Sequence, residues 1–122
     1  VYTCANISLC VAEIAVHEET TEAPQDYELV CLEIDGEHQP VMVNEDDLPP
    51  NWKEEEKPDA TQEIGDRFLE ACKHLMLQVP SAVVQGEYNF LLNPQHPQFC
   101  NVRIKSKEPF RFDERLFNKQ PV

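Results

Sequence analysis

Residues 75–92 read LMLQVPSAVVQGEYNFLL, and this stretch decides what kind of sheet the chain can build. Leu75–Val79 is a short apolar run, typical of a buried strand that we expect to stop at Pro80. Tyr88–Leu92 follows as a second strand candidate. No helix separates the two, and Ser81 is predicted to lie where the first strand ends.

Strand candidates outnumber helix candidates in the rest of the chain, and both predicted helices come early. Asn6 is expected to cap a helix that runs to about His17, and Thr61 to cap a second helix whose apolar residues recur at helical spacing, Ile64, Phe68, Leu69 and Cys72. Further strands are predicted at residues 1–3, 27–34, 41–43, 102–104 and 109–112, with an acidic, Pro-rich loop over residues 44–59. We therefore expect residues 1–122 to form a single α+β domain with a mostly antiparallel sheet.

The charge of the chain limits its partners. Ten basic and 23 acidic residues give a net charge of −13, which argues against direct nucleic-acid binding and favours a basic partner. No stretch approaches the roughly 20 apolar residues of a membrane-spanning helix, and no signal peptide is visible. The prediction is a cytoplasmic protein without a membrane partner.

The cysteines and histidines do not follow the spacing of a metal site. There are five cysteines and four histidines, with no CxxC pair and no HExxH motif. An odd cysteine count also argues against a disulfide framework. We therefore expect reduced thiols and no bound metal.

Glu13 is the only Asp, Glu, Lys or Arg among the first 17 residues. It lies in the first predicted helix, between Leu9 and Val16 on an apolar side. A carboxylate there costs free energy unless it is paired or opens into a cleft. A Glu at the edge of the helix, reaching solvent, is the other interpretation, and the pattern alone leaves the two about even.

Two other residues could take part in chemistry, although each also has a purely structural interpretation. Ser81 could bond a nearby carboxylate or a ligand, but a serine after a strand more often bonds its own backbone in a turn. No GxSxG motif surrounds it. Tyr2 is an aromatic residue at a strand end, where packing in the core is the ordinary role.

Six short segments, taken in order, resemble the RES-domain family of bacterial toxins. They span nearly the whole chain: Val1-Tyr2-Thr3 with Ser8-Leu9, Glu13 and Val16-His17; Leu48-Pro49-Pro50-Asn51-Trp52; Thr61–Asp66; Val79–Val84; Glu87–Pro94 with His96-Pro97 and Phe99; and Phe110–Asp113 with Arg115-Leu116.

The resemblance implies an ADP-ribosyltransferase-like fold and an NAD⁺-consuming activity that breaks the nicotinamide–ribose bond. It places Glu13 at the family's glutamate, Ser81 at its serine and Tyr2 at a further active-site tyrosine, all three facing NAD⁺. The family's arginine has no counterpart, because Arg67 is the first arginine here. Family members carry their arginines in a segment before the Val-Tyr-Thr strand. We therefore expect that residues 1–122 are a RES-like domain truncated at its N-terminus.

The resemblance also implies a partner, an antitoxin with an Xre-like DNA-binding region, and it leaves a homo-oligomer possible. Two functions stay open at this point. The first is a toxin that cleaves NAD⁺ by phosphorolysis, hydrolysis or ADP-ribosyl transfer. The second is a degenerate, non-catalytic RES domain that binds the antitoxin or a nucleotide.

Overall fold

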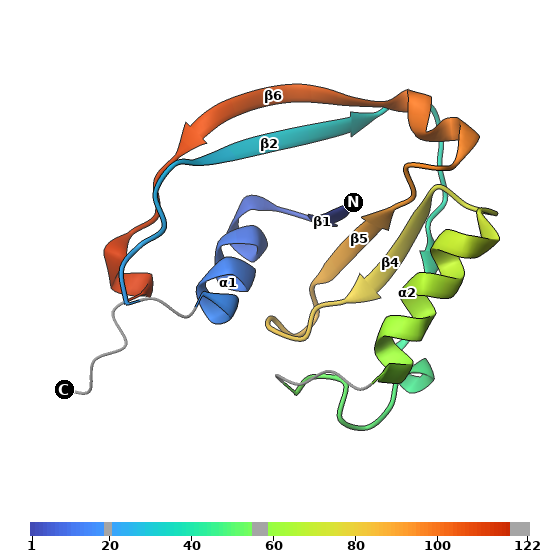
Figure 1. The fold of residues 1–122 in the computed structure, drawn as a ribbon, viewed down its shortest axis with the longest axis horizontal. Helices are drawn as coiled ribbons and strands as arrows, with labels where there is room; N and C mark the ends of the chain where they lie inside the picture. Colours follow the sequence, from blue (N-terminus) through green and yellow to red (C-terminus); the bar gives the residue numbers. More distant parts are fainter. Residues whose placement is uncertain (19–20, 55–58, 118–122) are drawn as a thin grey trace.

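The computed structural model describes residues 1–18, 21–54 and 59–117. Within these residues, two α-helices and six strands form an α+β architecture (Figure 1). Three short 3-10 helices accompany them, two between strands or helices at Glu45–Asp47 and Pro97–Asn101 and one after the last strand at Glu114–Leu116. The main elements are β1 (Tyr2–Cys4), α1 (Ile7–His17), β2 (Tyr27–Ile34), β3 (Val41–Met42), α2 (Asp59–Ala71), β4 (Met76–Pro80), β5 (Tyr88–Leu92) and β6 (Val102–Phe110).

The strands form two sheets, one with the order β1-β5-β4-β3 and one of β2 and β6 alone. Only the short β3–β4 pair is parallel, whereas β1–β5, β4–β5 and β2–β6 are antiparallel. The predicted α+β class with a mostly antiparallel sheet is confirmed. Neither helix in the described part of the chain is long and apolar enough to cross a membrane.

The hairpin of β4 and β5 forms the centre of the larger sheet. Leu77 and Leu92 on these strands, and Leu75 just before them, are 2–3% exposed. The connecting turn closes when the Ser81 N–H donates to the Glu87 carbonyl at 2.8 Å. Gly86 adopts a φ of +86° in this turn, a conformation that a residue with a Cβ rarely takes.

β1 adds to the free edge of β5 and thereby places α1. Tyr2 lies opposite Leu91 in the antiparallel register, and the Leu92 N–H donates to the Val1 carbonyl at 2.8 Å. The Asn6 side chain then accepts from the Leu9 N–H at 2.8 Å, so the predicted N-cap is confirmed. The helix ends at His17, as expected.

The β2–β6 ribbon stands apart from the larger sheet in Figure 1 and arches over α1. β2 has the predicted bounds, and a register shift follows Cys31. Apolar side chains pair across the ribbon, Leu32 with Ile104 and Ile34 with Val102. Ile104 is nevertheless 61% exposed. At one end of the ribbon, edge-to-face contacts join four aromatic rings, Tyr27, Phe110, Phe112 and Phe117.

Three local predictions were wrong. α2 begins at Asp59, so Thr61 lies in its first turn and is not the N-cap; its buried hydroxyl has no hydrogen-bond partner among the described residues. Cys72 lies beyond the helix, with a φ of +52°. The two strands expected at 102–104 and 109–112 are one continuous strand, because β2 pairs with β6 along its whole length.

A core truncation tests this description of the sheet. Leu77→Ala should lower the free energy of unfolding by about 2–5 kcal/mol, because β4 lies between two strands and this side chain is buried. Ile104→Ala on the exposed ribbon is the control and should cost less than about 1 kcal/mol. Urea denaturation of both variants checks this, and equal losses would contradict the placement of the core.

Candidate active site

Glu13 lies in the second turn of α1, and its side chain is 12% exposed. One carboxylate oxygen, Oε1, accepts two hydrogen bonds, from the Ser81 hydroxyl at 2.9 Å and from the Asn89 amide at 2.7 Å. The sequence left open whether this carboxylate is paired inside the protein or reaches solvent at the edge of the helix. In the structure it is largely buried and hydrogen-bonded. Three elements meet at this oxygen: α1, the turn after β4, and β5.

Ser81 has both of the roles considered for it. Its hydroxyl oxygen accepts from the N–H groups of Val83 and Val84 at 3.1 and 3.0 Å, which is the expected turn contact. The same hydroxyl donates its proton to Glu13. Because Ser81 is only 3% exposed, its backbone contacts fix the direction in which the hydroxyl points. The turn therefore orients the donor that holds the carboxylate.

Asn89 is a site residue that the sequence did not single out. It is fully buried in β5, at a position of the strand where an apolar side chain would be ordinary. Its Nδ2 donates to Glu13, and its Oδ1 has no hydrogen-bond partner among the described residues. The sequence did contain a signal for this residue, a polar side chain inside the apolar run Tyr88–Leu92, because a buried polar group nearly always has a hydrogen-bond partner.

Tyr2 lies at the edge of this cluster and is 56% exposed. Partial burial of the phenol and the negative charge of Glu13 raise the pKa of Tyr2 to about 12, while a hydrogen bond from Asn89 acts in the opposite direction. Cys4 lies opposite Asn89 in the β1–β5 register, so Tyr2, two residues earlier, points to the same face of the sheet as Asn89. Its phenol stays protonated and can donate a hydrogen bond.

The second carboxylate oxygen, Oε2, has a different neighbour. His17, one helical turn after Glu13, has its Nε2 at 3.4 Å from Oε2. The imidazole side chain is 57% exposed. Glu13 therefore has one oxygen, Oε1, held by two neutral donors and a second oxygen, Oε2, beside an exposed imidazole ring.

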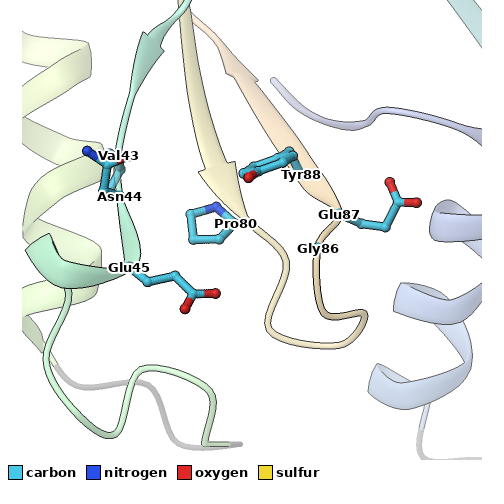
Figure 2. Close-up of a pocket in the computed structure, with 7 residues that line it drawn as sticks. All are labelled: Val43, Asn44, Glu45, Pro80, Gly86, Glu87 and Tyr88. Carbon is cyan, nitrogen blue, oxygen red and sulfur yellow. The ribbon is translucent and has the colours of Figure 1, made fainter.

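The hollow in Figure 2 is a different place on the surface. It has a volume of about 340 Å³ including its mouth, and its lining contains none of the three predicted site residues; it consists of Val43, Asn44, Glu45, Pro80, Gly86, Glu87 and Tyr88. Tyr88 precedes Asn89 in β5, and successive strand residues point to opposite faces. The hollow therefore does not open onto the Glu13 carboxylate.

The recorded ion pairs of the arginines lie elsewhere. Arg67 pairs with Glu63, Arg103 with Glu33 and Asp35, and Arg115 with Asp113. In the ranges that the structure describes, no group of three or more His, Cys, Asp or Glu could hold a metal ion. All five cysteines are free thiols. The absence of a bound metal stays a prediction.

Comparison with known proteins agrees with the six segments found in the sequence. A family model described as the RES domain matches residues 1–113. The chain belongs to the RES-domain family. The match runs from β1 to just beyond β6, so it includes every element that contacts Glu13.

RES-domain relatives come from several bacteria. A protein named "Toxin Res" from Yersinia enterocolitica is 35% identical over 118 residues, which are 95% of this chain and 76% of the relative. A "Toxin Res" from Pseudomonas putida is 34% identical, over 96% of this chain and 79% of the relative. A "Prs ADP-ribosylating toxin" from a Sphingobium species is 26% identical, over 98% and 75%.

The raised pKa of Tyr2 can be measured. Of the three tyrosines, one should ionise near pH 12 in an ultraviolet titration, and Tyr2→Phe should remove that step. The folded state keeps this proton between pH 10 and 12 while the unfolded state loses it, so stability should fall as the pH rises through this interval. Tyr88→Phe is the control, and a persistent step near pH 12 in Tyr2→Phe would contradict the assignment.

Proposed function

We propose that this protein is the toxin of a toxin–antitoxin pair and that it cleaves NAD⁺ between nicotinamide and ribose. The observation that carries the proposal is the Glu13 carboxylate, which is largely buried and held through one oxygen by Ser81 and Asn89. Both donors are neutral. Neither donor therefore neutralises the carboxylate.

The chemistry of the bond explains why such a carboxylate is useful. When nicotinamide leaves, positive charge develops on the ribose, as in the oxocarbenium-like transition state of glycoside cleavage. A carboxylate fixed beforehand in a largely water-excluded place stabilises that charge without reorganising. Glu13 would supply this charge through Oε2, since Oε1 is occupied.

The neighbouring residues would have supporting roles. Ser81 and Asn89 would hold Glu13 in one orientation, so both are positioning residues. Tyr2, half-exposed beside the carboxylate, would pack against the substrate or donate a hydrogen bond to it. NAD⁺ is the substrate in this proposal, and no step requires a metal.

The relatives support the proposal through their names. Two are called "Toxin Res" and one an ADP-ribosylating toxin, and an ADP-ribosylating enzyme breaks the nicotinamide–ribose bond of its donor. The partner would be an Xre-like antitoxin in the cytoplasm. A charge of −13 suits a basic segment of that partner and leaves DNA contact to the antitoxin.

A second function is favoured by one observation about the arginines. NAD⁺ carries two phosphates, which proteins commonly hold with arginine forks. Arg67, Arg103 and Arg115 instead pair with exposed acids. A RES domain that binds an antitoxin or a nucleotide without cleaving NAD⁺ would have this arrangement.

Glu13→Gln separates the two functions. The glutamine keeps an oxygen that can accept from Ser81 and Asn89, so the fold should persist while the negative charge is lost. We expect NAD⁺ consumption to fall by on the order of 10²–10³, the usual cost of losing one preorganised electrostatic group. Nicotinamide release from NAD⁺ measures the rate.

Glu63→Gln is the matched control. Glu63 also lies in a helix and pairs with a basic residue four positions later, Arg67, but its side chain is far more exposed than that of Glu13. It should leave the rate unchanged. Equal rates for the protein and Glu13→Gln would refute the role of Glu13. NAD⁺ binding without any turnover in the unaltered protein would favour the binding module.

A further inference from the structure

We infer that His17 is a catalytic residue that takes the proton from the acceptor in the second half of the reaction, and that the acceptor is a neutral oxygen nucleophile, water or a hydroxyl group. This inference rests on the proposed NAD⁺ cleavage at Glu13. It adds to that proposal the residue that would activate the molecule to which ADP-ribose is transferred.

The hydrogen bonds of Glu13 leave only one oxygen for further contacts. Oε1 already accepts from Ser81 and Asn89, whereas Oε2 has His17 Nε2 at 3.4 Å. A neutral imidazole in this position would turn an Nε2–H toward the carboxylate, since the carboxylate oxygen can only accept. Nδ1 then has the free lone pair and can accept a proton.

The surroundings of His17 suit a group that becomes positively charged during the reaction. His17 is the last residue of α1, where the partial negative charge of the helix end stabilises a cation. The Glu13 carboxylate lies 3.4 Å from its Nε2, and Glu18 follows it in the chain. With 57% of the side chain exposed, an acceptor can approach the ring from solvent.

The other three histidines have different surroundings. His96 Nδ1 accepts from the Gln98 N–H at 3.1 Å, and its Nε2 lies 3.3 Å from the Lys73 carbonyl. His38 lies 2.8 Å from the Asp35 carbonyl. His74 is exposed beyond α2. Among the recorded contacts of the four, only that of His17 reaches the Glu13 carboxylate.

The step balances without any further reactant. The bond between ribose C1′ and nicotinamide breaks, and its electron pair leaves with the nicotinamide nitrogen. A lone pair of the acceptor oxygen forms the new bond to C1′, and the proton of that oxygen moves to His17 Nδ1. The imidazolium, paired with Glu13, then releases the proton to solvent.

His17→Gln and His17→Ala test the role. Gln can keep an N–H near Glu13 but cannot take a proton at neutral pH, so it separates holding the carboxylate from accepting a proton. With water as acceptor, both variants should lower kcat by about 10²-fold and leave KM for NAD⁺ nearly unchanged, since general-base catalysis contributes about 10²–10⁴. Added imidazole should restore part of the rate of His17→Ala. His74→Ala is the control and should behave like the unaltered protein.

Inorganic phosphate provides the second arm. Its dianion is already negatively charged and needs no base for attack, so the loss should be clearly smaller when phosphate replaces water as acceptor. Chromatography separates ADP-ribose from its phosphorylated form. An unchanged kcat in His17→Gln, or an equal loss with water and phosphate, would overturn the inference while leaving NAD⁺ cleavage intact. No NAD⁺ turnover in the unaltered protein would overturn both.

Discussion

The burial of one negative charge, on Glu13, is the constraint on which the site depends. A carboxylate removed from water must have its hydrogen bonds replaced by the protein. Here two neutral side chains do so at a single oxygen, Ser81 from the turn after β4 and Asn89 from β5. The carboxylate can be held in this way only when α1, the turn and β5 are in register.

That register follows from backbone pairing in the larger sheet. β1 pairs with β5, and the short link from β1 to α1 leaves the helix little freedom beside Asn89. The pairing of β4 with β5 sets where the turn begins, and therefore where Ser81 lies. The backbone N–H groups of Val83 and Val84 then aim its hydroxyl at Glu13. The pairing of β1, β4 and β5 thus sets the positions of Glu13, Ser81 and Asn89.

Elements with a strong local pattern could be predicted from the sequence. The cap at Asn6, the end of the first helix at His17 and the bounds of β2 and β5 follow from capping chemistry and alternation, which act within a few residues. β6 could not be predicted as one strand. Its middle, Lys105–Glu108, is entirely polar, and it is extended because β2 pairs with it.

The sequence by itself determined that a solitary charge lies on an apolar helix, that a serine follows a buried strand, and that both occur in the segments of a RES domain. These are local patterns and strings, which one chain carries without reference to its fold. Only the tertiary structure decided that Glu13 points inward and that Asn89 is its second donor, whereas His17 lies beside Glu13 because the two are four residues apart in one helix. Contacts between residues 68 and 76 positions apart depend on how distant elements pack together, which no single short stretch of sequence specifies.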